Sequence, residues 1–466
     1  MNARLIGAVL FALIGLVVAI AAPIGALAHA GNLALGTIII TLGLWIFRPG
    51  GIPYTAGCSV LLTGCLVAGL PFPVTMSGYS SPALWVLIPA LYFGYVLQKT
   101  GLGRRIVFWV LKRFRPSYLT MVLGWVIVGI ILSLLTPSIT VRVAIVIPIA
   151  LGTVEACRLG FGGREASLIT LTAFGMALMP GSAWLTGSLY GPIFTGMFPA
   201  ELKAMGNSAA WLQGMGLFWL VVTISYIVLL YLLLRPRKPL ELERQAFQEE
   251  YDKLGPISRN EVVSLAVLVA AFVMFSTESI HHIPTAGSAL AAFFLLAVFG
   301  VITVADIGVG VSWDIILFLG AAICLPSISN ASGIAKWLAT LLDPVISAWA
   351  GNPGTFLLLF VLAYLALRFF DVAWGFATAA LLAPIMVPLY NKFGIHPIVI
   401  ATVFAIGGNV FFMAYQQPFA MMADAISKGT AWDNKYLSLG GLAYAVAAIL
   451  GMLVSIPYWK AIKFIP

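Results

Sequence analysis

YLTMVLGWVIVGIILSLLTPSITVRVAIVIPIALGTVEAC, residues 118–157, is an apolar stretch of 40 residues, about twice the length that one membrane-spanning helix needs. Its middle, Thr136-Pro137-Ser138-Ile139-Thr140, is polar and contains proline, which the interior of a helix tolerates poorly. The sequence therefore predicts two short helices that meet at a tip, a re-entrant hairpin that enters and leaves the membrane on one side. Irregular backbone at that depth survives only where protein buries it or where it lines a cavity.

A second stretch has the same design. Residues 353–391 read PGTFLLLFVLAYLALRFFDVAWGFATAALLAPIMVPLYN and break at Asp371-Val372-Ala373-Trp374-Gly375. The helix N-terminus after each tip presents unpaired N–H groups and the positive end of a helix dipole, and both suit an anion. Two such tips predict a site for a negatively charged solute midway through the membrane.

The composition of the whole chain indicates a multispanning membrane protein. Of 466 residues, 61% are hydrophobic and 9% are charged, whereas soluble domains carry about 25% charged residues. The net charge of +9 comes from basic residues between apolar runs, where they report membrane topology and not a nucleic-acid groove. The four cysteines form no CxxC motif and no cluster with histidine, so we expect no cofactor and no metal held by thiolates.

Eleven further apolar segments are predicted to cross the lipid bilayer, which gives an all-α polytopic fold of about eleven transmembrane helices plus two re-entrant hairpins. Arg4 places the N-terminus in the cytoplasm, and we expect the bacterial inner membrane. The first segment ends in Ala28-His29-Ala30, which resembles a signal-peptidase site, but its length favours an uncleaved anchor. The predicted crossings are 5–28, 33–47, 52–71, 82–98, 165–198, 211–234, 261–280, 284–303, 312–329, 396–428 and 436–457.

A hydrophilic segment separates two halves of the chain. Residues 235–261, RPRKPLELERQAFQEEYDKLGPISRNE, hold six basic and six acidic residues and are predicted to form a cytoplasmic, partly helical linker. Two roles remain open for it, a solvated connector or a regulatory element. The predicted organisation is N-terminal membrane helices at 1–80, a first repeat at 81–234, this linker, leading helices at 262–311 and a second repeat at 312–466.

The two repeats are predicted to have opposite orientations. In each, a span ends at a glycine (Gly101 or Gly333, 232 residues apart) and continues into an amphipathic arm, FWVLKRFRPS (108–117) or WLATLLDPVISA (337–348). Only the first arm is strongly basic, so equivalent arms should lie on opposite sides of the membrane. Inverted repeats are typical of secondary transporters, whose site lies near the midplane where the copies meet.

The crossing that follows each hairpin is also interrupted. Glycine and proline break the first at 180–192 and the second at 407–418. One such break is weak evidence, because membrane helices often contain glycine and proline. A hairpin paired with a broken helix, present twice, is the specific signal for a transporter.

These features resemble the divalent anion:sodium symporter family, over about residues 80–460. The best local match is SWDIILFLGAAICLPSISNASGIAKWLA (312–339), which is similar to the family's WD-led helix and the arm after it. The resemblance implies transport of an anion, a homodimer and an elevator-like movement. In this movement the hairpins and broken helices would slide against a scaffold that includes the spans 82–98 and 261–329.

The residues at the hairpin tips depart from the family pattern. The family's Ser-Asn-Thr maps to Ser138-Ile139-Thr140 and to Trp374-Gly375-Phe376, so neither Ile139 nor Gly375 supplies the side-chain oxygen that the family uses for sodium. The resemblance therefore leaves sodium possible but weakly supported. The substrate contacts that it implies are Ser138, Thr140, Arg142, Gly187, Ser188, Trp374, Gly375, Phe376, Thr378, Gln416 and Gln417.

Arg142 follows the first tip and could supply a permanent positive charge where the family uses a bound cation. A guanidinium can hold a carboxylate or a sulfonate through two hydrogen bonds. Our hypothesis is that Arg142 contacts substrate and partly substitutes for sodium. The alternative is an arginine neutralised by a hairpin C-terminus or by Asp371.

Arg368 and Asp371 lie three residues apart before the second tip and are candidates for coupling. They could form a local ion pair, or Asp371 could take up a proton during transport. Trp374 and Phe376 could form an apolar wall of the pocket or simply pack in the core. Gln416 and Gln417 are uncharged donors on the second broken helix.

The predicted function is secondary transport of a small organic anion, most simply a dicarboxylate. Sulfate or sulfonate transport, anion exchange and proton coupling remain open. An enzyme is disfavoured because the histidines lie at span ends and no HExxH or Gly-x-Ser-x-Gly motif is present. A cation antiporter would need an acidic residue where the broken helices cross, and 174–192 and 405–418 contain none.

Overall fold

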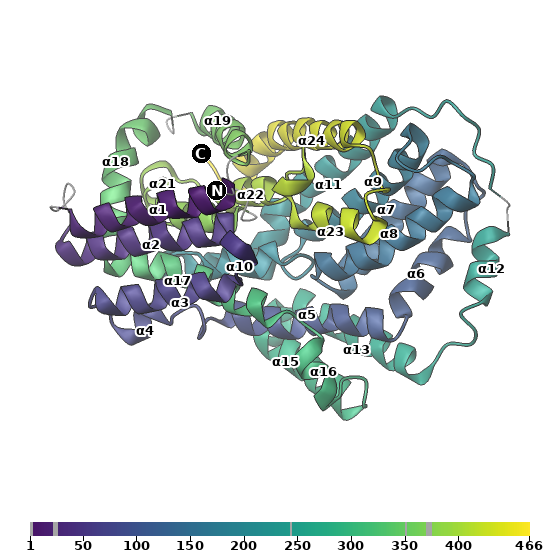
Figure 1. Ribbon diagram of the computed structural model, residues 1–466, viewed down its shortest axis with the longest axis horizontal. Coiled ribbons are helices and arrows are strands. Elements are labelled where there is room, and N and C mark those ends of the chain that lie inside the picture. The colour runs from purple at the N-terminus through teal and green to yellow at the C-terminus, as the bar shows by residue number, and fades with distance from the viewer. Residues whose placement is uncertain (1–2, 22–26, 243–244, 350–351, 370–374) are drawn as a thin grey trace.

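The computed structural model describes residues 3–21, 27–242, 245–349, 352–369 and 375–466, and all regular structure in these ranges is helical (Figure 1). Within them, eight helices are long and apolar enough to cross a membrane, and five shorter apolar helices accompany them. This confirms the predicted all-α polytopic fold.

The helices of the first half, before the linker, alternate between long apolar helices and short connecting turns. They are α1 (Ala3–Ile20), α2 (His29–Phe47), η1 (Pro49–Gly51), α3 (Tyr54–Val67), α4 (Phe72–Thr75), α5 (Pro82–Lys99), α6 (Leu102–Leu111), α7 (Tyr118–Leu135), α8 (Ile139–Ala156), α9 (Arg164–Leu178), η2 (Pro180–Ala183), α10 (Tyr190–Gly196), η3 (Ala200–Met205) and α11 (Ser208–Leu233).

The linker and the second half follow in a similar order. Their helices are α12 (Ala246–Asp252), α13 (Arg259–Ser276), α14 (Glu278–His281), α15 (Thr285–Val298), α16 (Val304–Val309), α17 (Trp313–Ala331), α18 (Ile334–Trp349), α19 (Pro353–Leu367), α20 (Phe376–Leu382), η4 (Ala383–Ile385), α21 (Met386–Phe393), α22 (Pro397–Gly408), η5 (Ala414–Gln416), α23 (Pro418–Ser427) and α24 (Asn434–Ala461).

Each predicted crossing falls on a helix, and two fall on interrupted helices. The segment 165–198 contains α9, η2 and α10, and the segment 396–428 contains α22, η5 and α23. The interruptions coincide with the glycines and prolines that predicted them, because proline cannot donate to the helix ladder.

The first hairpin is formed by α7 and α8, with its tip at residues 136–138. Thr136 ends α7 in an extended conformation, and the Ser138 side chain caps α8 by accepting a hydrogen bond from the Val141 N–H at 3.4 Å. The Thr136 hydroxyl faces the Ala90 carbonyl, halfway along α5. Both legs pack against α6 at the end of α5. The chain thus reverses beside the middle of α5. The two legs differ from the predicted short helices, because each has 18 residues and is long and apolar enough to cross a membrane.

The second hairpin repeats this arrangement with α19, α20, η4 and α21. Both legs contact the arm α18, as both legs of the first contact α6. Gly375 begins α20 with φ of 72°, a left-handed conformation that glycine adopts without strain. The arm and hairpin of the first half lie at one end of the long axis, and α18, α19 and α21 lie at the other (Figure 1). An inverted repeat requires this placement.

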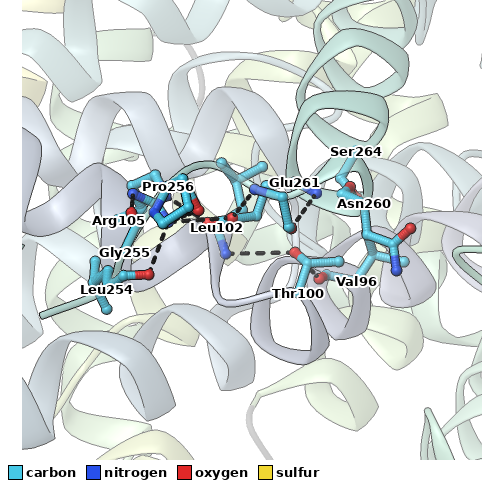
Figure 2. A network of polar contacts seen from close by, with 11 residues as sticks. Val96, Thr100, Leu102, Arg105, Leu254, Gly255, Pro256, Asn260, Glu261 and Ser264 are labelled. Carbon is cyan, nitrogen blue, oxygen red and sulfur yellow. Dashed lines mark hydrogen bonds and ion pairs between the residues drawn. The ribbon is translucent and has the colours of Figure 1, made fainter.

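A buried ion pair connects the linker to α6 (Figure 2). The Arg105 Nε lies 2.6 Å from a carboxylate oxygen of Glu261, and the Arg105 guanidinium also donates to the carbonyls of Leu254, Gly255 and Pro256. The Lys112 ammonium lies 3.4 Å from the centre of the Tyr251 ring, a cation–π contact with α12. These contacts hold α6, α12 and the start of α13 together.

A second ion pair ties the end of α5 to α16. Lys99 lies 2.6 Å from Asp306, which also accepts from the Tyr95 hydroxyl and the Thr303 hydroxyl. Burial raises the pKa of Asp306, but the hydrogen bonds from Lys99, Thr303 and Tyr95 outweigh it and hold the pKa well below its ordinary value. The carboxylate therefore stays charged at neutral pH, and α5 is anchored to the helices α15 and α16.

Candidate functional site

The two broken helices meet at the Gly408 carbonyl, which accepts one hydrogen bond from the first half and one from its own half. Tyr190, at the start of α10, donates from its hydroxyl to the Gly408 carbonyl at 2.6 Å. The Gln417 Nε2 donates to the same carbonyl at 2.8 Å. We call this region the junction: the first tip (136–142), the first break (179–190), residues 364–369 and 375–376 of the second hairpin, and the second break (407–417).

Arg142 lies in the first turn of α8, on the face buried in the junction. Its side chain is 0% exposed, and Nε, Nη1 and Nη2 have no hydrogen-bond partner among the residues that the structure describes. A charged group inside a membrane protein is costly and is found with a partner or a use. The five N–H donors of this guanidinium are therefore available to an anionic ligand.

The backbone of the first break approaches Arg142 closely because two glycines leave room. A Cβ on Gly181 would lie 2.6 Å from Arg142 Nη1 and 2.0 Å from the Gly187 carbonyl oxygen. Nearby, the Trp184 Nε1 donates to the Ser133 carbonyl at 3.1 Å and so ties the break to α7. The first tip and the first break are therefore one packed unit.

Three more buried polar atoms of the two breaks have no partner among the described residues: Ser182 Oγ, Asn409 Oδ1 and Gln417 Oε1. Buried polar atoms are nearly always hydrogen bonded in folded proteins, so such atoms beside a candidate site suggest contacts with a ligand or with water. Gln417 was predicted as a donor, but its Nε2 atom already donates to the Gly408 carbonyl, and the atom without a partner is the acceptor Oε1. Ser182 and Asn409 were not predicted, although each adjoins a break glycine.

Arg368 is the second buried guanidinium of the junction, also 0% exposed. It donates from Nε to the Gly407 carbonyl at 2.9 Å and from Nη2 to the Gln416 carbonyl in a short hydrogen bond. The Gln416 side chain is fully engaged, because Nε2 donates to the Arg368 carbonyl and Oε1 accepts from the Met413 N–H. Gln416 therefore holds the second break together.

The structure brings most of the remaining predicted residues to the junction. Ser138 caps α8, and the Ser188 hydroxyl accepts from the Tyr190 N–H at 3.3 Å. The Phe376 ring packs against the Tyr190 ring with centroids 5.4 Å apart, which makes it part of the core between the halves. Thr378 is half-buried on α20. Asp371 and Trp374 lie outside the described residues.

Thr140 differs from its neighbours because it is exposed. It lies two residues before Arg142, which places the two side chains about 200° apart around the helix. Thr140 begins a stripe on α8 that continues through Ala144, Pro148 and Gly152 at intervals of four residues. The last three of these residues line a cavity.

Two cavities approach the junction from different ends of α13. One, of about 730 Å³, lies between α8, the turn from α5 to α6 and the linker helix α12. It includes Ile145, three residues after Arg142. The other, of about 530 Å³, lies between α11 and the end of α13 and includes Trp184 and Thr186 of the first break. Arg142 itself lines neither cavity.

A helical membrane protein with two opposed hairpins, two broken helices and a buried cationic site has the design of a secondary transporter. The family model described as "Sodium:sulfate symporter transmembrane region" matches residues 2–465, and the chain belongs to this family. The match confirms the resemblance drawn from the sequence.

Similar proteins are named as transporters. The chloroplastic dicarboxylate transporter 1 of Arabidopsis thaliana is 26% identical over 281 residues, 59% of this chain and 50% of that protein. Its namesake in Spinacia oleracea is 24% identical over 417 residues, 85% and 71% of the two chains. The L-tartrate/succinate antiporter of Escherichia coli is 25% identical over 324 residues, 67% and 65% of the two chains. The family and these relatives are transporters and not enzymes.

A solved structure with a similar outline is that of the Alcanivorax borkumensis YdaH transporter. It covers 94% of this chain and 100% of its own, with a TM-score of 0.49 and 16% sequence identity.

Proposed function

We propose that this protein is a secondary transporter that carries a small dicarboxylate across the cell membrane, and that Arg142 binds one of its carboxylates. The observation that carries the proposal is the fully buried Arg142 guanidinium, with three nitrogen atoms that lack a partner among the described residues. A carboxylate would satisfy it through two parallel, charge-assisted hydrogen bonds. The names of the relatives, dicarboxylate and tartrate/succinate transporters, support this substrate class.

The proposal includes a location, an assembly and a movement. The protein would lie in the bacterial inner membrane with its N-terminus in the cytoplasm and would form a homodimer. The hairpins and broken helices would move together as an elevator against a frame that contains α5, α13, α15 and α17. The two cavities support this division, because both lie where the two groups of helices meet.

Two alternatives differ in cargo or in coupling. The family name includes sulfate, which the same guanidinium could bind. Exchange of one anion for another is favoured by a specific observation: Arg142 cannot leave the carrier, so an empty carrier would move an unneutralised charge through the membrane. Such a movement is costly, and a second anion would remove the cost.

Uptake of radiolabelled succinate into proteoliposomes tests the proposal. The wild-type protein should take up succinate, with faster uptake when the vesicles contain unlabelled dicarboxylate if exchange is the mode. Arg142→Ala should lower uptake about 100-fold, because two charge-assisted hydrogen bonds contribute roughly 3 kcal/mol. Arg142→Lys should retain part of the activity through its charge.

Competition by unlabelled anions for succinate uptake distinguishes a dicarboxylate substrate from sulfate. Unlabelled succinate and tartrate should compete with the label, and sulfate should compete weakly. Strong inhibition by sulfate alone would assign the sulfate alternative. Normal uptake by folded Arg142→Ala would refute the role of Arg142.

A further inference from the structure

The second break is where a cation would be expected in a family of sodium:sulfate symporters. Transporters with discontinuous helices commonly bind sodium through carbonyls of unwound backbone and at C-terminal ends of half-helices. Here α22 ends at Gly408, and its last turn leaves carbonyls without partners in the helix. The candidate ligands are the carbonyls of Gly407 and Gly408, together with that of Gln416 across the break.

The protein itself already occupies all three carbonyls. Arg368 donates to Gly407 and Gln416, whereas Tyr190 and Gln417 both donate to Gly408. The arrangement is reciprocal, because the Gln416 amide donates back to the Arg368 carbonyl at 3.3 Å. A sodium ion would have to displace the Arg368 guanidinium from Gly407 and Gln416 and two neutral donors from Gly408, so the residues present do not fit a sodium site at the second break.

The packing around Arg368 is also too tight for a hydrated ion. A Cβ on Gly407 would lie 1.8 Å from an atom of the Tyr364 ring, and the Tyr364 hydroxyl donates to the Gly375 carbonyl at 2.8 Å. The second hairpin and the second broken helix are therefore in direct contact through Tyr364 and Arg368, with the guanidinium as the cation between them.

We infer that Arg368 is a built-in cation that replaces a dissociable sodium ion at the second break. Its positive charge compensates the carbonyl dipoles there, and its two donor atoms fix the position of Gly407 and Gln416 relative to the second hairpin. Arg368 is thus a positioning residue, whereas Arg142, with its donors free, contacts the substrate. The inference rests on the proposed function for its transport readout, and it predicts transport that does not depend on sodium.

The first test compares salts. Wild-type protein in proteoliposomes should take up succinate at rates that agree within about twofold in sodium chloride and in choline chloride. The thermal unfolding midpoint of the purified protein should also be the same in the two salts, and this second measurement does not need transport. A tenfold stimulation by sodium, or a midpoint raised by sodium, would overturn the inference.

The second test removes the guanidinium. Arg368→Ala should lower the maximal rate at least tenfold with a smaller change in KM, and added guanidinium ion should restore part of the rate and raise the unfolding midpoint. Arg368→Lys should fall between the two. Lys392→Ala is the matched control, because this exposed lysine of the same hairpin pairs with Asp343 at the surface; it should behave as wild type.

The outcomes separate the two proposals. Unchanged transport by Arg368→Ala, with Arg142→Ala inactive, would refute the built-in cation and leave the transport function standing. Absence of succinate uptake by the wild-type protein would refute the proposed function, while the response of the unfolding midpoint to sodium and guanidinium would still decide the role of Arg368. If Arg368→Ala does not fold, a guanidinium-dependent recovery of folded protein would support the inference, and a sodium-dependent recovery would overturn it.

Discussion

Glycine at position 181 determines how closely the first break can approach the Arg142 guanidinium. Cβ atoms in proteins rarely lie within 3.0 Å of other heavy atoms, yet a Cβ here would be 2.0 Å from the Gly187 carbonyl oxygen and 2.6 Å from Arg142. Neither neighbour can retreat freely, because the carbonyl is backbone and the guanidinium is fully buried. The geometry of the proposed anion site thus depends on the lack of a Cβ atom at position 181.

Gly181→Ala should therefore weaken transport without unfolding the protein. Overpacking of this kind costs about 1–3 kcal/mol, so we expect KM for succinate to rise about tenfold or more as Arg142 is displaced. Gly308→Ala is the control, because a Cβ on this helical glycine meets nothing within 4 Å. Equal KM values for the two variants would show that the approach of the break to Arg142 is irrelevant to binding.

Residue pairing in the junction could not be predicted from sequence, for a physical reason. Arg368 reaches Gly407 and Gln416, 39 and 48 residues away, and Tyr190 reaches Gly408, 218 residues away. No local pattern encodes such contacts. The sequence predicted Arg142 as a substrate contact and Arg368 as a coupling candidate or the partner of Asp371. Only the structure shows that Arg368 donates to backbone carbonyls of the second break, whereas Arg142 has no hydrogen-bond partner among the described residues.

At the scale of elements, much more could be predicted. Apolar length determines the helices, and proline and glycine determine their ends, so the tip at 136–138 and the breaks after Leu178 and Gly408 follow from local chemistry. The exposure of each helix face depends on packing and could not be predicted in the same way. On α8 the face with Thr140 and Pro148 is exposed, whereas Arg142 and Ile147 are buried.

This division of α8 predicts a pattern of labelling by a hydrophilic maleimide. Cysteines at Thr140, Ala144 and Pro148 should react, with the reagent arriving from the side of the linker, because the 730 Å³ cavity runs along this face beside α12. A cysteine at Ile147, which is fully buried on the same helix, is the control and should react at least tenfold more slowly. The four native cysteines are buried, so their background reaction should be low. Uniform labelling of all four positions would contradict the arrangement.

At the scale of the whole molecule, two groups of helices can be distinguished by the ion pairs and packing contacts within each group. The ion pairs Lys99–Asp306 and Arg105–Glu261 join α5 and α6 to α13 and α16. The first hairpin packs mainly against α9 and α23 of the broken helices, whereas the second hairpin packs against α17 and α18 as well as against α22. The helix α24 packs against α9, α11 and α19. No ion pair among the described residues joins the first hairpin to α5 or α6. In the proposed elevator movement, the first hairpin would therefore slide along the boundary between α8 and α6.

A cross-link across this boundary should stop transport if the hairpins move. Gly103 of α6 and Ile145 of α8 are neighbours, since a Cβ on Gly103 would lie 3.2 Å from Ile145 Cγ1. The pair Gly103→Cys and Ile145→Cys should transport when reduced and lose at least nine-tenths of its rate when oxidised. Gly354→Cys with Ile456→Cys joins α19 to α24 inside the proposed moving group, where a Cβ on Gly354 lies 3.4 Å from Ile456 Cγ2; this control should stay active after oxidation. Full activity of the oxidised first pair would show that transport proceeds without movement between α6 and α8.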